Sequence, residues 1–316
     1  MEITSEIQDR IDKLHNKYGG LGQDLLSYLD GLLYADVTTY WDYIQIDTLL
    51  TLQKPKTNFP DEVVFIIYHQ ITELYFKLAL REYAQIGKLK KLNKDFFIAR
   101  VSRINRYFDA LINSFDIMVS GMEKEQFLKF RMSLLPASGF QSAQYREIEI
   151  YSTDFINLVS KDKRELFNEK SSITEMFEEV YWKHGATEAE TQKKTLTLSQ
   201  FEDKYKEHFI KLGEKCRKEN LWSAYLRLSK ADQQDFEVIK CLKDNDSNVN
   251  INWPLVHYKS AVKYLSTNNN NIAATGGTNW QKYLPPKFQK RIFYPLIWSK
   301  SEKEHWGKGW VEKALS

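Results

Sequence analysis

One apolar stretch with a histidine at its centre constrains the fold of this chain more than any other feature. The stretch runs from Asp61 to Leu78, and its apolar residues cover nearly every direction of the helix that it predicts. Pro60 stands just before it, and Asp61 and Glu62 suit the positive end of a helix. A helix of this kind is buried on most sides, so other helices of the chain must cover it.

His69 lies in the middle of this predicted helix, with Phe65 one turn earlier on the same face. We expect its imidazole to be buried, and a buried imidazole needs partners for its nitrogens. Two interpretations are therefore open. His69 is a core histidine satisfied by a backbone or hydroxyl group, as most lone histidines on apolar faces are, or it is part of a functional site.

The composition indicates an all-α protein. With 316 residues, of which 42% are apolar, the chain can bury a sizeable core. It has only 13 glycines and 7 prolines, and few breakers between long periodic segments are typical of helical folds. No internal repeat and no clear linker interrupts it. We therefore predict one helical domain over residues 1–316, with residues 1–40 as an N-terminal helical arm that contributes to oligomer contacts.

Charge and cysteine content exclude several classes of protein. The net charge of +3 is spread along the chain, and no basic stripe interleaved with aromatic residues indicates nucleic-acid binding. Cys216 and Cys241 are the two cysteines, which indicates neither a disulfide framework nor a zinc site. The first twenty residues lack an apolar leader core, and we identify no run of membrane-spanning length. We expect a cytoplasmic protein that does not associate with membranes.

Periodicity places the other elements. Ser142 is a candidate N-cap, because its hydroxyl can accept a hydrogen bond from a first-turn amide. Residues 243–252 are so polar that we interpret them as a break between helices. Helices are predicted at about 3–18, 61–88, 96–119, 123–135, 173–184, 197–211 and 219–243. A further helix opens at Gln144, after Ser142, and a short helix lies around 253–257.

Of the six histidines, only His69 and His257 lie in apolar helical surroundings. Two such histidines, far apart in sequence, fit the two sides of a planar cofactor, where one coordinates iron and the other faces the open side. Motifs of zinc proteases, calcium-binding loops and nucleotide-binding loops are missing. Spacing alone also leaves a structural role for both histidines open.

Arg131 is the next candidate. It follows an apolar stretch and precedes a Ser-Gly turn, where a guanidinium can present a bidentate fork to a carboxylate. The alternative is a surface arginine at the end of a helix.

Several blocks carry a resemblance to a known family. The run Phe65–Leu74 resembles the signature of the tryptophan 2,3-dioxygenases, and so does Phe130-Arg131 followed by Ser138–Glu149. Further blocks at Asp47–Pro55, Trp253–His257 and Thr275–Gly277 match the family in the same order, so that the resemblance extends over about 40–285.

The resemblance implies a fold and a reaction. The fold would be a single large helical domain of the tryptophan/indoleamine dioxygenase type, with haem b between the helices. The reaction would insert both atoms of O2 into the indole 2,3 bond of L-tryptophan and give N-formyl-L-kynurenine, the first step of the kynurenine pathway. The resemblance also implies a homotetramer built as a dimer of dimers.

The same resemblance assigns roles to residues. His257 would be the proximal iron ligand, and His69 would accept a hydrogen bond from the indole N–H on the distal side. Phe65 would pack on the indole ring, and Arg131 would clamp the substrate carboxylate. The other implied positions are Ser138 and Gly139 near the haem, Thr275 at the ammonium group, and Tyr40, Tyr43 and Ile44, which would reach into a neighbouring subunit's pocket.

Two places depart from the family pattern and indicate a divergent branch. The family usually has arginines around its proximal histidine, where this chain has Pro254 three residues before His257. The loop Ala274–Trp280 is bulkier than its counterpart. Two alternatives therefore stay open. One is a related haem-dependent aromatic oxygenase that inserts a single oxygen into a substituted tryptophan or indole, and the other is a haem-binding sensor without turnover.

Overall fold

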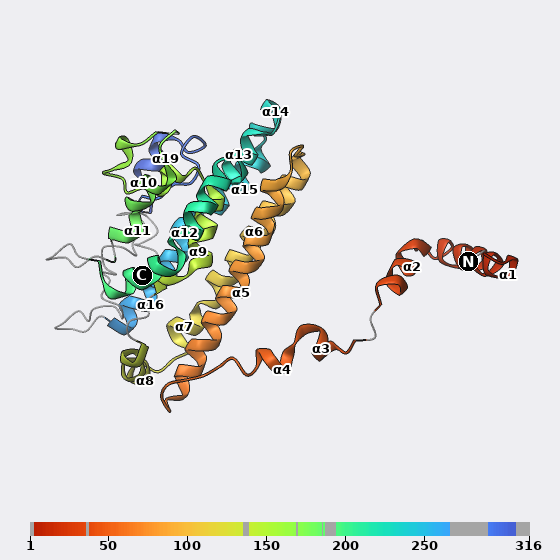
Figure 1. Ribbon diagram of the computed structural model, residues 1–316, viewed down its shortest axis with the longest axis horizontal. Coiled ribbons are helices and arrows are strands. Elements are labelled where there is room, and N and C mark those ends of the chain that lie inside the picture. The colour runs from red at the N-terminus through yellow and green to blue at the C-terminus, as the bar shows by residue number, and fades with distance from the viewer. Residues whose placement is uncertain are drawn as a thin grey trace. The chain divides into compact units, whose positions relative to one another are not determined.

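Helices form nearly all the regular structure of the part of the chain that the computed structural model describes, which is residues 3–35, 38–134, 139–168, 170–184, 186, 194–265 and 290–307 (Figure 1). Within these ranges no strand forms, and the nearest approach to one is an isolated antiparallel bridge between Val159 and Val180. The prediction of an all-α fold is confirmed.

The chain divides into two compact units, residues 1–53 and 54–316. The first unit holds four helices within its described residues, and two of them begin at capped positions. The side chain of Asp24 accepts from the backbone N–H groups of Leu26 and Ser27, and the Thr39 hydroxyl accepts from that of Asp42. The single domain over residues 1–316 stays a prediction. The helices of this unit are α1 (Ser5–Gly19), α2 (Leu25–Tyr34), α3 (Tyr40–Ile44) and α4 (Ile46–Leu49).

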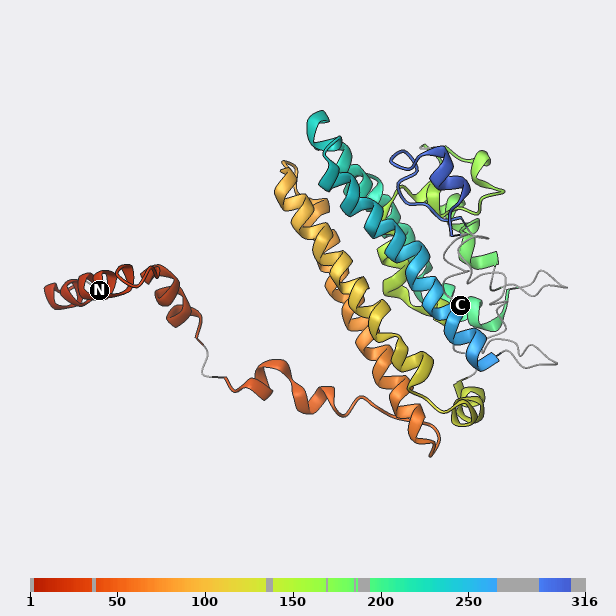
Figure 2. The same cartoon turned by 180° about the vertical axis from the view of Figure 1, so that it is seen from behind.

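The second unit is built on two long helices, α5 (Pro60–Lys88) and α6 (Lys94–Ser114), which lie side by side in both views (Figures 1 and 2). The remaining elements are α7 (Asp116–Ser120), α8 (Lys124–Phe130), η1 (Arg131–Leu134), η2 (Gly139–Gln141), α9 (Ala143–Ser152), η3 (Phe155–Leu158), η4 (Arg164–Leu166), α10 (Ile173–Glu178), α11 (Tyr181–His184), α12 (Leu196–Glu219), α13 (Leu221–Leu226), α14 (Lys230–Gln233), α15 (Phe236–Ser247), η5 (Asn248–Asn252), α16 (Trp253–Leu265) and α19 (Lys300–Glu304).

Helix α5 is the centre of this unit. It packs against α6 and α9, and α15 packs against α6. Phe76, Tyr83 and Ile86 of α5 are fully buried in the contact. The sequence therefore predicts the existence of α5 and its central place correctly. The expected burial on most sides is wrong, because one side of the helix carries the exposed apolar residues Ile67, Ile71, Leu74 and Leu78. Helix α5 is also long and apolar enough to cross a membrane. This is weak evidence for a membrane-spanning helix, because the core helices of other proteins are often as long and as apolar.

The polar segment at 243–252 is not a break. Helix α15 passes into a π-helical turn, η5, which passes directly into α16, so one continuous helix covers residues 236–265. Four polar side chains of this segment are buried and hydrogen-bonded, namely Asn245, Asp246, Asn248 and Asn250, and the first two are inaccessible to solvent. Sequence periodicity misses this because polar residues are expected outside a core.

Candidate functional site

Two helices that are distant in sequence carry the candidate histidines. On α5, Nδ1 of His69 lies 2.7 Å from the carbonyl oxygen of Phe65. On α16, Nδ1 of His257 lies 2.9 Å from the carbonyl oxygen of Trp253. A carbonyl only accepts, so Nδ1 carries the proton in both rings and Nε2 keeps its lone pair in the neutral form. Each imidazole therefore offers one acceptor or ligand atom.

Both histidines are held neutral. Desolvation lowers the pKa of His257 to about 4, against the opposing effect of the Trp253 carbonyl. Desolvation also lowers the pKa of His69. The charge of His69 contributes to the lowered pKa of His257, so the two imidazoles lie close enough to interact. At neutral pH both Nε2 atoms are unprotonated.

The expected burial of His69 is wrong. Its side chain is exposed to solvent, although the surrounding chain is dense enough to lower its pKa. The helix directs this ring out of the packed face, whereas its neighbour Tyr68 is buried and bonds the Leu111 carbonyl. His69 is thus a poor candidate for a core histidine and a good one for a group that meets a ligand.

Aromatic rings surround both imidazoles. The rings of Phe65 and His69 have centroids 4.1 Å apart, and Phe130 lies 5.7 Å from Phe65 in an edge-to-face arrangement. The His257 ring lies 4.4 Å from Phe115 and 4.3 Å from Trp253. Flat apolar groups can pack against such walls.

Arg131 is buried, with 4% of its side chain exposed. It directly follows Phe130 and opens η1, so the Phe65–Phe130 contact brings its segment to the His69 end of α5. Desolvation lowers its pKa from the usual arginine value. The alternative of a surface arginine is therefore wrong. A buried guanidinium group usually has hydrogen-bond acceptors for its N–H groups.

The other predicted positions are only partly described. Gly139 opens η2 and is exposed, and Ser142 caps α9 through a 3.2 Å bond from the backbone N–H of Tyr145, as predicted. Ser138 and Thr275 lie outside the described residues.

Tyr40, Tyr43 and Ile44 lie together on α3 in the first unit. Tyr40 and Tyr43 are 71% and 79% exposed, and Ile44 is 38% exposed. Exposed aromatic side chains of this size on a short helix are typical of a surface that another chain covers.

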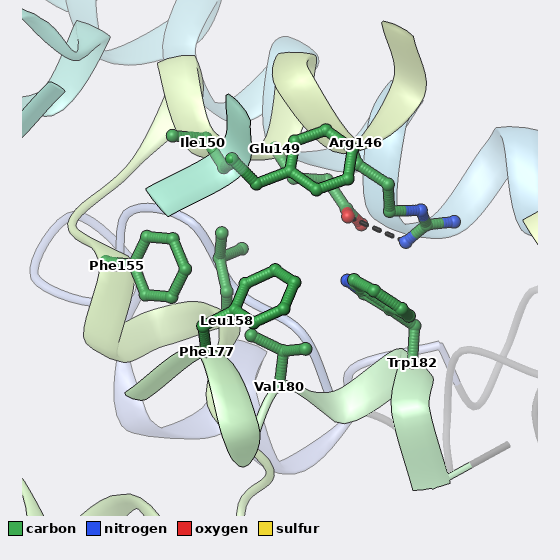
Figure 3. A pocket seen from close by; sticks show the side chains of 9 residues that line it. Arg146, Glu149, Ile150, Phe155, Leu158, Phe177, Val180 and Trp182 are labelled. Carbon is green, nitrogen blue, oxygen red and sulfur yellow. Dashed lines mark hydrogen bonds and ion pairs between the residues drawn. The ribbon is translucent and has the colours of Figure 1, made fainter. Parts of the chain in front are cut away.

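A protein-only metal site does not form in the described ranges, where no three histidine, cysteine, aspartate or glutamate side chains gather around one point. Among the other histidines, His208 is exposed and lies 2.9 Å from a Glu147 oxygen. A cavity of about 10 Å³ lies elsewhere, between Phe155, Phe177 and Trp182 (Figure 3). It has room for about one water molecule and no substrate.

Comparison of the sequence with known protein families shows to which family the chain belongs. The family model described as tryptophan 2,3-dioxygenase matches residues 33–250. The chain belongs to this family. His69 and Arg131 lie within the matched residues, and His257 lies just beyond them.

Relatives named tryptophan 2,3-dioxygenase match a shorter part of the chain. The protein of Bacillus cereus (strain ATCC 10987 / NRS 248) is 45% identical over 120 residues, which are 37% of this chain and 42% of that protein. The protein of Ruegeria sp. (strain TM1040) is 43% identical over 122 residues, with the same shares. That of Sorangium cellulosum (strain So ce56) is 42% identical over 123 residues, or 35% of this chain and 29% of the relative. The chain thus spans less than half the length of these relatives.

Sequence reasoning missed the side chains that hold the turn before the helix of His257. Tyr145, Asp246 and Asn250 converge on the turn before α16, and the polarity of Asp246 and Asn250 suggested a break between helices instead. The one signal that points to them is Pro254, which stands inside a predicted helix.

Proposed function

We propose that this chain is a haem-dependent tryptophan 2,3-dioxygenase, which inserts both atoms of O2 into the indole 2,3 bond of L-tryptophan to give N-formyl-L-kynurenine. The observation that carries the proposal is the pair of neutral imidazoles on α5 and α16, each with Nδ1 bonded to its own helix and Nε2 unprotonated. Family membership and the names of the relatives support the same reaction.

The residues fit haem b. An imidazole whose Nδ1–H is bonded to a backbone carbonyl is oriented and tautomerically fixed as histidine ligands of metals usually are. His257 has this arrangement, and a porphyrin needs only one or two such protein ligands. Phe115 and Trp253 supply apolar surface beside it. When bound, ferrous haem with one histidine ligand supplies the site at which O2 is activated.

His69 and Phe65 recognise the indole in this proposal. Indole has one N–H donor and a flat apolar face, and a neutral imidazole acceptor next to a phenyl ring complements both. His69 and Phe65 are one turn apart, with ring centroids 4.1 Å apart. Nε2 of His69 accepts the indole N–H, and the ring of Phe65 packs on the indole. A site that bonds a substrate N–H discriminates strongly against analogues without it.

Arg131 binds the substrate carboxylate. Its burial removes competing water, so a charge-assisted bidentate bond is stronger there than at a surface. Thr275, Ser138 and Gly139 are proposed to complete the pocket around the ammonium group and the haem edge, as the resemblance implies.

The proposed assembly is a homotetramer, a dimer of dimers, in a cytoplasmic protein. The exposed aromatic side chains of Tyr40 and Tyr43, with Ile44 beside them, support a role for the first unit in covering a neighbouring subunit's site. Size-exclusion chromatography with light scattering tests this. The proposal predicts a tetramer for the wild type and a smaller species or a raised KM for Tyr43→Ala.

Haem reconstitution tests the activity. Purified protein is titrated with haemin, reduced without oxygen, and then given L-tryptophan and air. The proposal predicts a Soret band at one haem per chain and growth of the N-formylkynurenine band in the near ultraviolet. A Soret band without consumption of tryptophan favours the sensor, and the absence of specific haem binding contradicts the proposal.

A further inference from the structure

The helix that carries His257 contains a wide turn immediately before it. Residues Asn248–Asn252 form a π-helical turn between α15 and α16. A π turn accommodates about one residue more than an α turn of the same rise. Single π turns inside α-helices are frequent at functional sites. This turn therefore changes the direction in which every later side chain of the helix points.

Helical arithmetic shows what the extra residue does to His257. Val238 is fully buried on α15 and precedes His257 by nineteen positions. The wide turn takes up about one of these nineteen residues. The remaining spacing of about eighteen residues equals five full turns at 3.6 residues per turn. His257 then points in the same direction as Val238. In an uninterrupted α-helix it would be rotated away by about 100°.

Pro254 supplies a local cause for the wide turn. In the interior of a helix, proline lacks the N–H of the ladder, and its ring clashes with the carbonyl four residues earlier. Pro254 is buried in the first turn of α16, so the preceding turn must open to accommodate it. In the i to i+5 pattern of a π turn, the carbonyl of Val249 would be bonded by the missing N–H of residue 254.

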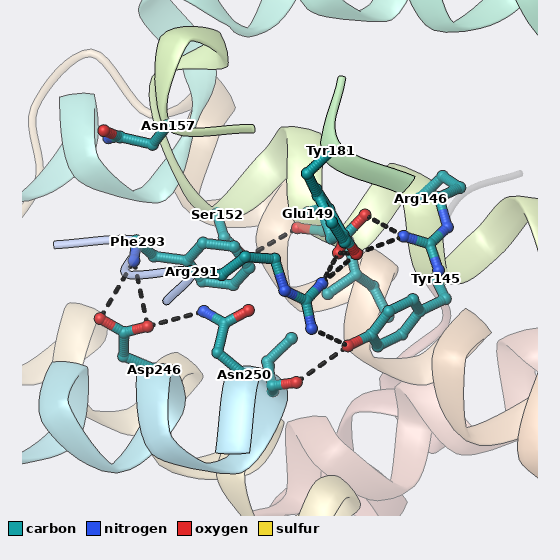
Figure 4. Close-up of polar contacts among 12 residues, drawn as sticks. Tyr145, Arg146, Glu149, Ser152, Asn157, Tyr181, Asp246, Asn250, Arg291 and Phe293 are labelled. Carbon is teal, nitrogen blue, oxygen red and sulfur yellow. Dashed lines mark hydrogen bonds and ion pairs between the residues drawn. The ribbon is translucent and has the colours of Figure 1, made fainter. Parts of the chain in front are cut away.

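Tyr145 of α9 replaces that missing donor. Its hydroxyl donates to the carbonyl oxygen of Val249 at 2.8 Å, and the tyrosine is buried. A buried carbonyl without a partner costs about 1–3 kcal/mol, so this bond removes a penalty that the wide turn would otherwise carry. Nη2 of Arg291 donates to the hydroxyl oxygen of Tyr145 at 3.4 Å (Figure 4). This bond connects the turn to the segment 290–307.

Asp246 holds the other side of the turn. Its Oδ1 accepts from Nδ2 of Asn250 at 2.7 Å, which ties the last turn of α15 to the middle of η5. The same carboxylate accepts the backbone N–H of Phe293 at 3.0 Å (Figure 4). It also accepts the indole N–H of Trp298 at 2.9 Å. Side chains from α9, α15 and the segment 290–307 thus fix the turn from several directions.

We propose that this wide turn, which Pro254 opens and Tyr145, Asp246 and Asn250 hold, sets the rotation of α16 and so directs His257 into the site. These four are positioning residues, since none of them is placed in contact with substrate or cofactor. The consequence for haem rests on the proposed function, whereas the orientation of His257 does not. The family usually has arginines around this histidine, and the proline that stands here at position 254 is then part of how this chain orients His257.

The test compares Tyr145→Phe with Tyr83→Phe. Tyr83 is a second buried tyrosine, and its hydroxyl donates to Asn245 of α15 at 3.2 Å, upstream of the wide turn. Both variants lose one buried hydroxyl, but only Tyr145→Phe leaves the Val249 carbonyl without its donor. Asn250→Ala and Asn105→Ala form a second pair, because Asn105 bonds the Cys241 carbonyl of α15 at 2.9 Å.

The first readout needs no haem. The rate at which diethyl pyrocarbonate modifies His257 in the haem-free protein, mapped by mass spectrometry, reports how the ring is presented. We expect Tyr145→Phe and Asn250→Ala to change this rate several-fold, while Tyr83→Phe and Asn105→Ala leave it within twofold of wild type. Equal rates in test and control variants of similar melting temperature would overturn the proposal.

The second readout uses the haem-loaded protein. We expect Tyr145→Phe to shift the iron–histidine stretching band and to speed haem transfer to apomyoglobin about tenfold, the scale on which groups behind a ligand act. Restoring an N–H with Pro254→Ala should reduce the effect of Tyr145→Phe and leave that of Tyr83→Phe unchanged. If Tyr145→Phe has the same effect in the wild type and in Pro254→Ala, the role assigned to Pro254 is overturned. A wild type that takes no haem would contradict the proposed function, while the haem-free comparison would still decide this inference.

Discussion

His69 on α5 and His257 on α16 are 188 positions apart in the chain, yet the charge of His69 helps to lower the pKa of His257. Each ring uses Nδ1 to bond a carbonyl of its own helix, so Nε2 is the reactive atom in both. The two imidazoles are chemically equivalent in isolation. Their surroundings distinguish them, since Phe65 lies on His69 while Phe115 and Trp253 lie on His257.

Substitution of the proposed ligand tests this distinction. We expect His257→Ala to lose specific haem binding, because alanine has no imidazole nitrogen to coordinate the iron. Absorbance titration with haemin measures the effect, and circular dichroism checks the fold. His208→Ala, which removes an exposed histidine paired with Glu147, is the control. A full Soret band in His257→Ala would exclude His257 as the ligand.

Arg131 is expected to act on the carboxylate of the substrate. Arg131→Ala should lower kcat/KM for L-tryptophan by about 2–4 kcal/mol, the range for removing one partner of a desolvated charge pair. The same variant should lose little activity toward an indole substrate without a carboxylate. Because Arg131 is buried, Arg131→Lys is the companion variant that keeps the charge without the fork. An equal loss for both substrates would show a structural role instead.

Asp246 gives the stability of the protein a pH dependence. Desolvation raises its pKa from 3.8 to about 6 in the folded state, so between these values the folded chain binds more protons at this site than the unfolded chain. Stability from this group is therefore greatest below about pH 4 and falls as the pH rises to about 6, by about 3 kcal/mol in total. Urea unfolding across this range should show the decline.

Asp246→Asn provides the comparison for this measurement. The amide does not titrate, so the difference in unfolding free energy between wild type and variant should shrink as the pH rises from 4 to 6. A difference that stays constant over the range would contradict the raised pKa. The other carboxylates titrate in both proteins, so their contributions to the pH dependence cancel in this difference.

Gly87 tests the close packing behind α5. A Cβ at this position would lie 2.2 Å from the backbone oxygen of Glu219, which cannot move without shifting α12. Gly87→Ala should therefore destabilise by about 1–3 kcal/mol despite the better helix propensity of alanine. Gly31→Ala in α2, where a Cβ meets nothing within 4 Å, should be neutral or slightly stabilising. Thermal unfolding of both measures this, and a stabilised Gly87→Ala would contradict the packing.

Periodicity predicted those parts of the fold in which one face of a helix is apolar. Helix α5 and its proline start, the buried face of α6 and the Ser142 cap all follow from local pattern. The predicted helix at 96–119 is divided at Phe115 into α6 and α7, a change that spacing does not reveal because both pieces keep the same apolar face.

Local pattern failed where tertiary partners satisfy polar groups. Residues 243–252 look like a loop because Asp246 and Asn250 are polar, but their partners come from the same turn and from the segment 290–307. The accessibility of His69 could not be predicted either, since an apolar neighbourhood in sequence does not fix which face of α5 is covered. Only the fold brings these groups together.

The central claim is that this chain inserts both atoms of O2 into tryptophan. The most direct measurement is a single turnover of the haem-reconstituted ferrous protein with L-tryptophan under ¹⁸O₂, followed by mass spectrometry of the product. The account predicts N-formylkynurenine that carries two labelled oxygens. A product with one added oxygen would contradict it and identify the chain as a monooxygenating relative, and tryptophan recovered unchanged from a protein with a full Soret band would identify a binding protein.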